Sequence, residues 1–563
     1  MLLALQASSV QLYAQPVTHQ AYEQTIVTPK AVGRYFWLPI QESAPEGKLQ
    51  VISSNRLLME QNVRFAREQV DYYMPLDLAP YQSDRNLRIC VQHVPTGSIC
   101  FSKLAQTDAV TYQLIDEKYR SAYHHAPLRG WMNDPNGMFY QDGVWHLYYQ
   151  HNPFGSMWGN MHWGHSTSRD LIHWEAQPLA LIPDVWGTVF SGSCVVDYEN
   201  TAGFGRGAVV AVFTSSRPTP FGGDVQAQSI AYSIDGGLTF TKYEGNPVIT
   251  SEAHDFRDPK VFWNAEAGFW NMILAAGQEM QIYSSANLKE WKLESSFGRE
   301  YGNHGGVWEC PDLMKMPVEG TGQEKWMLIC NINPGGPFGG SATQYFIGSF
   351  DGHTFTCESA PEVTKWMDYG KDHYATVTFS NAPENRKVAI AWMSNWQYAN
   401  QVPTRQFRSA NSIVRDLGLF EYNGETYCSV RPAKEMEAAR GAVVSQPTEQ
   451  CEIVITLRGE AEITLRNNQG ERVVMKYDPE EELFYMNRLK SGDVSFSDNF
   501  PTITSAPTYG PVKQLRIFVD KCSIEALDAE GKMAMTNLVF PTSPYNKLII
   551  KGKAKAKIYN IGK

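Results

Sequence analysis

The chain has 563 residues, and its balance of 43% hydrophobic and 19% charged residues is typical of a folded globular protein, not of a disordered one. Its 49 Lys and Arg residues against 59 Asp and Glu residues give a net charge of −10, which argues against a nucleic-acid-binding protein because such proteins present a basic face. No apolar run is long enough for a transmembrane helix. Aromatic residues make up 12%, which favours a β-rich protein and a surface that stacks against sugar rings.

The first fifteen residues, MLLALQASSVQLYAQ, combine a short apolar stretch with a small residue, Ala14, near a point where a signal peptidase could cut. A basic segment is missing before it, since the first Lys is Lys30. Residues 1–15 therefore predict the remnant of a secretion signal, and with it a periplasmic or secreted protein, or else an ordinary terminus of a cytoplasmic one.

Residues 16–118 contain short runs rich in aromatic and β-branched residues, RYFWLPI, KLQVISS, VDYYMPL and LRICVQHV, separated by Pro, Gly, Asp and Asn. This pattern predicts a β-sandwich-like N-terminal domain. Cys90 and Cys100 flank the segment VQHVPTGSI, which we interpret as a hairpin that carries either a disulfide or two buried thiols. The nine cysteines show no CxxC spacing, which argues against a structural zinc site.

Residues 119–432 contain a repeat in which one strand is followed by a second and then by a turn with an aromatic residue. The aromatic residues that mark the first four units are Trp174, Phe240, Trp291 and Phe355, and VAIAWMSNW begins a fifth unit. Repeats of this kind predict a five-bladed β-propeller, with a pair of β-sandwiches as the alternative. Residues 433–563 alternate again, as in EIVITLRG, AEITLRNN and LRIFVDKC, and predict a C-terminal β-sandwich. The predicted fold class is all-β.

Three acidic residues lie near the predicted inner strands of the propeller, which converge on one funnel. They are Asp134 in WMNDPNG, Asp258 in FRDP and Glu309 in GVWECPD. Taken singly, each has a purely structural interpretation: a turn cap, a surface salt bridge with Arg257, or a strand end. An inward-facing Arg257 would instead keep a neighbouring carboxylate ionised, and the apolar flanks of Glu309 would raise its pKa, as a general acid requires.

These three segments resemble the acidic blocks of glycoside hydrolase family 32, the β-fructofuranosidases, which include invertases, inulinases and levanases. Further matching segments are YQHNP at 149–153, WG at 158–159, HWGH at 162–165, FSGS at 190–193 and SNWQY at 394–398. The resemblance covers roughly residues 120 to 563 and implies a five-bladed propeller followed by a sandwich. The N-terminal part resembles an extra β domain of some bacterial fructanases, which either binds glycan or braces the propeller.

The resemblance implies that Asp134 is the nucleophile, Glu309 the acid/base and Asp258 the stabiliser of the transition state. It also implies a fructose pocket formed by Asn133, Gln150, Trp158, Phe190, Ser191, Arg257 and Trp396. Asp312 is expected to support the site from the same block as Glu309. Attack on the anomeric carbon would form a covalent fructosyl-enzyme and retain configuration, with the carboxyls ~5–5.5 Å apart. This chemistry needs no metal, nucleotide or organic cofactor, and the pairs His124–His125 and His162–His165 are expected in core or loop positions.

The segment NPGGPFGGS at 333–341 resembles that of exo-acting fructanases. We therefore expect release of terminal fructose from fructans (levan or inulin), fructo-oligosaccharides and sucrose. Three alternatives remain: an inverting arabinosidase or xylosidase on a similar propeller, with carboxyls ~6.5–9.5 Å apart; a non-catalytic fructan-binding protein; and an enzyme that transfers fructosyl units to sugar.

Overall fold

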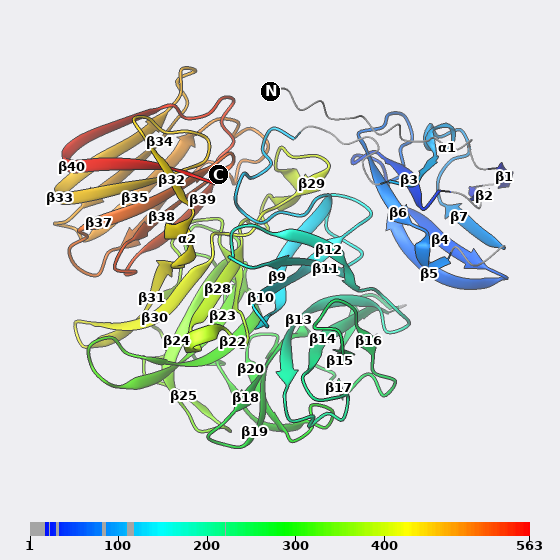
Figure 1. Cartoon of the computed structure of the whole chain (residues 1–563), viewed down its shortest axis with the longest axis horizontal. Helices are drawn as coiled ribbons and strands as arrows, with labels where there is room; N and C mark the ends of the chain where they lie inside the picture. Colours follow the sequence, from blue (N-terminus) through cyan, green and yellow to red (C-terminus); the bar gives the residue numbers. More distant parts are fainter. Residues whose placement is uncertain are drawn as a thin grey trace.

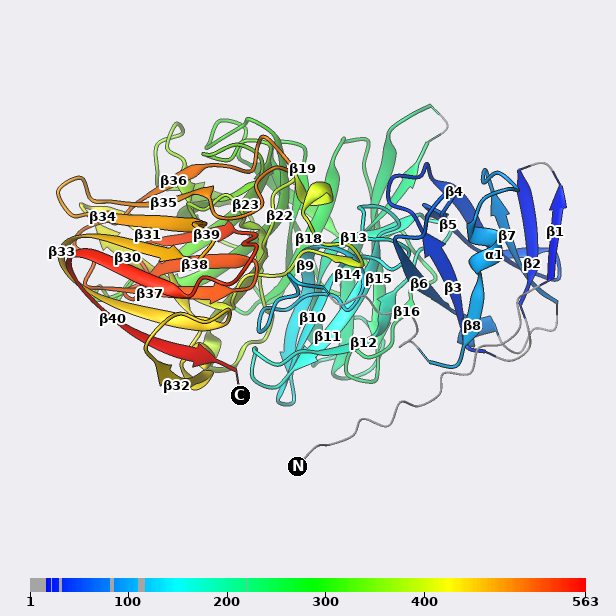
Figure 2. The same ribbon diagram turned by 90° about the horizontal axis from the view of Figure 1, so that it is seen from above.

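The computed structural model describes residues 17–21, 23–29, 33–81, 86–109, 117–219 and 221–562. The expected signal remnant at 1–15 lies outside these residues. Strands dominate, and they form three groups that lie in a row, with the N-terminal strands at one end, a central propeller and the C-terminal strands at the other end (Figures 1 and 2). The all-β prediction is confirmed. Within the described residues, no helix has the length and apolar character needed to cross a membrane.

Two sheets form the N-terminal module and enclose its hydrophobic core. The larger sheet has the order β1 (Val17–Ala21), β2 (Gln24–Thr28), β7 (Leu87–Gln92), β4 (Gly47–Ser53) and β5 (Arg56–Val63). The smaller one consists of β6 (Tyr72–Asp77), β3 (Tyr35–Ile40) and β8 (Ala105–Thr107). Buried and partly exposed residues alternate along β4 and β6, so one face of each strand points to the core.

The segment between Cys90 and Cys100 is not the expected hairpin. Cys90 lies in β7, whereas Cys100 begins the short helix α1 (Cys100–Lys103). A turn closed by the hydrogen bond from Ser98 N to Pro95 O directs the chain away from the sheet, and Cys100 N then bonds to Ala66 O. Both cysteines are buried free thiols, so of the two alternatives the thiols are correct.

Five sheets form the propeller. From the inner strand outward, the first blade contains β9 (Gly130–Gln141), β10 (Val144–Asn152), β11 (His162–Ser168) and β12 (Glu175–Leu181). In the same order, the second contains β13 (Thr188–Asp197), β14 (Ala208–Pro218), β15 (Asp224–Ser233), β16 (Thr241–Lys242) and β17 (Ile249–Thr250), and the third contains β18 (Phe256–Asn264), β19 (Phe269–Ala276), β20 (Met280–Ser285) and β21 (Lys292–Phe297). The fourth contains β22 (Val307–Pro317), β23 (Glu324–Asn333), β24 (Ala342–Phe350), β25 (Phe355–Cys357) and β26 (Lys365–Trp366), and the fifth contains β27 (Tyr374–Thr378), β28 (Lys387–Trp392), β30 (Arg415–Tyr422) and β31 (Glu425–Pro432). A short strand, β29 (Phe407–Arg408), adds to the first blade beside β9. The five inner strands contact one another in a closed ring, because β27 contacts β9 again.

The aromatic residues that marked the sequence repeat occupy equivalent places, immediately before or at the start of a blade's fourth strand. The preceding turn also repeats its chemistry. In each of the first four blades one side-chain oxygen accepts hydrogen bonds from two successive backbone N–H groups; the acceptors are Asp170, Asp235, Asn287 and Asp351. The repeat therefore reflects one turn structure used four times.

The C-terminal module is a strongly curled sheet around its own core. Seven strands follow the order β36 (Ile503–Pro507), β35 (Leu483–Lys490), β34 (Arg472–Asp478), β33 (Cys451–Arg466), β37 (Gln514–Asp520), β38 (Ser523–Asp528) and β39 (Ala534–Leu538), and β40 (Lys547–Ile561) pairs with both β33 and β32 (Arg440–Val444). EIVITLRG and AEITLRNN, which we expected as two strands, form the single strand β33, because its pairing with β40 continues across an irregularity between Leu457 and Ala461. The boundary expected after residue 432 falls between the end of β31 and helix α2 (Glu435–Ala438).

Buried charges join the propeller to this module. Arg415 of β30 pairs with Asp368 at 2.8 Å and with Glu525 of β38 at 2.5 Å. His124 lies between Asp520 and Glu525, with each ring nitrogen 2.8 Å from a carboxylate oxygen. Burial lowers the pKa of His124, but the hydrogen bonds to both carboxylates outweigh it and raise the pKa to about 9. This histidine therefore has a structural, charged role at the interface.

Candidate active site

One cavity of about 360 Å³ opens at the centre of the propeller, where three inner strands bring their carboxylates together. Asp134 comes from β9, Asp258 from β18 and Glu309 from β22. All ten residues predicted for the site line this cavity: the three carboxylates and Asn133, Gln150, Trp158, Phe190, Ser191, Arg257 and Trp396. Five further lining residues were not predicted: Met161, Asp224, Gln226, Asp255 and Asn333.

The three carboxylates stand where the inner strands are irregular. The pairings of β9 with β10, β18 with β19 and β22 with β23 each shift register beside them. A proline lies within or directly at the edge of each shift: Pro135, Pro259 and Pro311. Proline has no N–H for the ladder, so it favours a bulge that redirects a neighbouring side chain. Asp258 and the residue after Glu309, Cys310, also have positive φ angles of 67° and 43°. Backbone strain of this kind concentrates at functional sites.

Asp134 is held by hydrogen-bond donors on both oxygens. Asn133 donates to Oδ1 at 2.9 Å and Ser191 donates to Oδ2 at 2.8 Å. The indole of Trp131 fixes the amide of Asn133 by donating to its Oδ1 at 2.8 Å. Burial and the charge of Glu309 raise the pKa of Asp134, while the donors Asn133, Ser191 and Cys310 lower it. The pKa of Asp134 remains above its ordinary value, and the donors limit this rise and so favour the ionised form that a nucleophile needs.

Asp258 is almost fully buried, at 5% exposure. Its Oδ2 accepts a hydrogen bond from Cys310 N at 2.9 Å, and its own N–H donates to Thr214 Oγ1 at 3.0 Å. Burial raises its pKa to about 7; Arg257 opposes this rise, and the charge of Asp134 adds to it. The folded site therefore disfavours the charge on Asp258.

Glu309 is oriented by two side chains. Arg257 Nε and Nη2 lie 3.1 and 3.0 Å from its Oε1, and the hydroxyl of Tyr374 on β27 donates to its Oε2. Arg257 also bonds to Asp255 at 2.6 Å. Burial lowers the pKa of Arg257, but the surrounding carboxylates raise it above its ordinary value. A permanent cation thus stands beside Glu309.

Sequence reasoning missed the roles of Cys310 and Tyr374. The Cys310 thiol lies 3.4 Å from Asp134 Oδ2 and 3.5 Å from Asp258 Oδ2, so it joins two of the three carboxylates. Burial raises the pKa of this thiol well above its usual range, so it stays protonated and can donate. Cys310 was visible in its motif, but Tyr374 had no signal because it lies in a different blade.

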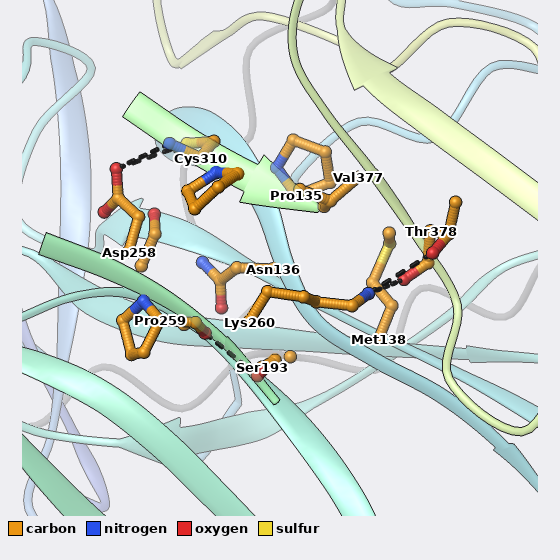
Figure 3. A pocket seen from close by; sticks show the side chains of 14 residues that line it. Pro135, Asn136, Met138, Ser193, Asp258, Pro259, Lys260, Cys310, Val377 and Thr378 are labelled. Carbon is orange, nitrogen blue, oxygen red and sulfur yellow. Dashed lines mark hydrogen bonds between the residues drawn. The ribbon is translucent and has the colours of Figure 1, made fainter. Parts of the chain in front are cut away.

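The cavity is closed below by a tightly packed floor, which Figure 3 shows around Asp258 and Cys310. The space left there is about 10 Å³. Lys260 crosses it and donates to Thr378 O at 2.6 Å, and Ser193 donates to Pro259 O at 2.9 Å. This space is too small to admit a sugar ring.

Asp312, which we expected to support the site from the same block as Glu309, pairs with Lys260 Nζ at 3.0 Å and accepts from Thr378 N and Oγ1 at 2.8 and 2.6 Å. Within the described residues none of its hydrogen bonds reaches the three carboxylates.

Aromatic side chains form the upper wall of the cavity. The rings of Trp158 and Phe190 meet edge to face with centroids 6.4 Å apart, and Trp396 stacks on Trp131 at 5.6 Å. Gln150 is buried, and its Nε2 has no hydrogen-bond partner in the part of the chain that the structure describes. Apolar faces with unused polar groups between them suit a polyhydroxylated ring. Among the described residues, no group of three or more His, Cys, Asp and Glu side chains is arranged to hold a metal ion.

Comparison with known proteins agrees with this geometry. The family model "Glycosyl hydrolases family 32 N-terminal domain" matches residues 124–430, and "Glycosyl hydrolases family 32 C terminal" matches residues 423–561. Residues 22–123 match a "Domain of unknown function (DUF4980)". A levanase of Bacillus subtilis is 44% identical over 77% of this chain and 68% of its own length. An extracellular exo-inulinase of Aspergillus niger is 38% identical over 79% of this chain and 95% of its own.

Solved structures show the same relationship. An exo-inulinase from Aspergillus awamori aligns with a TM-score of 0.74 at 34% identity and covers 80% of this chain and 99% of its own. A β-fructofuranosidase from Schwanniomyces occidentalis, complexed with fructosyl-erythritol, aligns with a TM-score of 0.71 at 33% identity, with 79% and 98% covered. The chain therefore belongs to glycoside hydrolase family 32, and it is a glycoside hydrolase of the β-fructofuranosidase type.

Proposed function

We propose that this protein is an exo-acting, retaining hydrolase that releases terminal β-D-fructofuranosyl units from fructans, fructo-oligosaccharides and sucrose. One observation carries the proposal. Asp134 is held by three donors that favour its ionised form, and Glu309 is held separately by Arg257 and Tyr374 in the same cavity. Two carboxyls with different surroundings can divide the roles of nucleophile and proton donor.

In the proposed mechanism, Asp134 attacks the anomeric carbon C2 of fructose while Glu309 gives its proton to the glycosidic oxygen. The bond to the leaving group breaks and a fructosyl-enzyme forms. Glu309 then takes a proton from water, whose oxygen attacks C2 and releases Asp134. Asp258 stabilises the positive charge that develops on the ring between these states, because an anion in a water-poor site interacts strongly with a nearby cation.

The closed floor supports exo-action. A cavity of about 360 Å³ that ends at a packed floor accepts the end of a chain more readily than its middle. Trp396 N bonds to Ser341 Oγ at 3.1 Å, so the segment 333–341 helps to place one wall. The relatives named levanase and exo-inulinase support fructan as the substrate class. Fructan polymers are too large to cross a cell membrane unaided, so the proposal includes action outside the cytoplasm. The names of extracellular relatives also support this location.

Azide rescue tests the proposed roles with an activated aryl fructoside. Asp134→Asn should lose activity by on the order of 10³-fold or more, because no covalent intermediate forms. Glu309→Ala should still form the intermediate, which azide then attacks in the vacated space to give a fructosyl azide of retained configuration. Rescue of Asp134→Asn with inverted product, and none for Glu309→Ala, would contradict the assignment.

Two product analyses test the remaining claims. Proton NMR of the first product formed distinguishes retention from inversion. Early digests of levan and inulin should contain mainly free fructose, whereas mainly oligosaccharides would contradict exo-action. Kestose-type products at high sucrose would instead show that fructosyl transfer competes with hydrolysis.

A further inference from the structure

The loop between β10 and β11, residues 153–160, carries Trp158 to the wall of the active-site cavity. Trp158 is 45% exposed, and its backbone N–H donates a hydrogen bond to Asn400 Oδ1 at 3.1 Å. A large aromatic ring with so much free surface does not fix its own position by packing. The backbone on either side of Trp158 must therefore be held in place.

The N-terminal module holds this loop at three points. Phe154 packs into the hydrophobic core of that module. Ser156 is fully buried: its N–H donates to the hydroxyl of Tyr72 at 3.1 Å, and its Oγ donates to Glu42 Oε1 at 2.5 Å. Asn160 exchanges two hydrogen bonds with the backbone of Asn62 in β5, at 2.7 and 3.0 Å. Two of these anchors lie two residues before and two residues after Trp158.

A buried cation of the propeller also depends on the module. The side chain of Arg408, in β29, is 5% exposed, and its Nη2 pairs with Glu42 Oε2 at 2.9 Å. Its Nη1 donates to Ser156 O at 3.1 Å. Within the described residues, no other carboxylate lies at ion-pair distance from Arg408. A buried guanidinium without a counter-ion destabilises the fold. Loss of Glu42 would therefore leave the buried charge of Arg408 beside the first blade unpaired.

We propose that the N-terminal module is a positioning element of the active site, in which Glu42 and Tyr72 hold the loop 153–160 and thereby set the place of Trp158 against bound fructoside. The substrate part of this inference rests on the proposed function. Glu42 touches both Ser156 and Arg408, so it fixes the loop to the module and to the first blade together. Misplacement of a wall residue weakens substrate binding more than the chemical step.

The test uses full-length Glu42→Gln and Tyr72→Phe, which keep the side-chain shapes. Asp77→Asn is the matched control, because Asp77 accepts two hydrogen bonds from Arg34 in the same module and does not contact the loop. Both test variants should raise KM for sucrose and for inulin roughly three- to tenfold and change kcat about twofold or less, whereas Asp77→Asn should leave both unchanged.

Two further measurements separate positioning from general stability. In a Trp158→Ala background, Glu42→Gln should have no additional effect on KM, because it acts through the missing ring. Hydrogen exchange of the amides in 153–160 should be faster in Glu42→Gln than in Asp77→Asn. Unchanged KM, an additive effect with Trp158→Ala, equal exchange, or failure of both test variants to fold would each overturn the proposal. If the wild type hydrolysed no β-fructoside, the proposed function would fail, and the exchange measurement would still test the anchoring of the loop.

Discussion

Replacing Asp258 by Asn should stabilise the protein at neutral and alkaline pH while destroying its activity. The Asp258 carboxyl is buried in the folded site, and its pKa is raised from 3.8 to about 7 by burial first, with the charge of Asp134 adding and Arg257 opposing. The neutral amide keeps the shape and can still accept the hydrogen bond from Cys310 N. It removes only the charge that the folded state disfavours.

The magnitude follows from linkage between folding and protonation. The folded state favours protonated Asp258, so the cost of its charge is absent below pH 3.8, grows between pH 3.8 and about 7, and is complete above about 7. At 1.36 kcal/mol per pH unit, this interval corresponds to ~4 kcal/mol at most. For a domain of this size, 1 kcal/mol shifts the melting temperature by roughly 2 °C, so we expect a gain of several degrees.

Thermal denaturation from pH 4 to pH 8 tests this reasoning. The melting temperatures of Asp258→Asn and wild type should coincide near pH 4 and diverge as the pH rises. Asp142→Asn is the control, because it removes the same charge from an exposed turn between β9 and β10. Activity of Asp258→Asn should fall more in kcat than in KM, since the charge matters most when the ring is cationic. Parallel curves for wild type and Asp258→Asn would refute a buried, destabilising charge.

Three other changes give distinct readouts. Cys310→Ala removes a thiol that donates to Asp134 and lowers its pKa, so the pKa of Asp134 should rise and the acidic limb of kcat/KM should move to higher pH. Cys310→Ser, which keeps a donor, should show no such upward shift. Gln150→Leu removes an amide whose Nε2 has no partner among the described residues; KM should rise by on the order of tenfold without loss of thermal stability, and an unchanged KM would show that Gln150 does not bind substrate. Tyr374→Phe removes a donor to Glu309, and kcat should fall roughly tenfold for sucrose but less for an aryl fructoside whose leaving group departs readily; equal losses would contradict a role in leaving-group protonation.

The convergence of the three carboxylates on one cavity could be predicted from the sequence because each lies at the start of a repeat unit, whereas their catalytic roles came from the family resemblance and stay a proposal. Each carboxylate is followed within two residues by a proline that interrupts the ladder, and the irregularities lie on the inner strands of the first, third and fourth blades. The repeat that predicted the blades also has a local cause, since an Asp or Asn caps the same turn in four of them. Short-range turn and ladder chemistry can be inferred from residue types alone.

What the sequence did not predict depends on contacts between distant segments. Tyr374 of the fifth blade bonds to Glu309 of the fourth, and Glu42 bonds to Ser156, which lies 114 residues further along the chain. The segment before Cys100 looked like a hairpin because its composition suits one, but a hydrogen bond from Cys100 N to Ala66 O directs it elsewhere. β33 continues through an irregularity because β40, which is far along the chain, pairs with both of its halves.

Stability and catalysis conflict mainly at one place in this molecule, the carboxylate site at the centre of the propeller. Three carboxylates share a buried site with one guanidinium, and two of them have pKa values raised by burial and by one another. Asp258 and Cys310 add positive φ angles on the strands that carry them. Outside this site, buried charges such as Arg415 and Arg408 are paired. Each of these two has a carboxylate partner from a neighbouring module. Well-paired charges between modules can therefore hold the inner strands in place against the repulsion and strain that the chemistry requires.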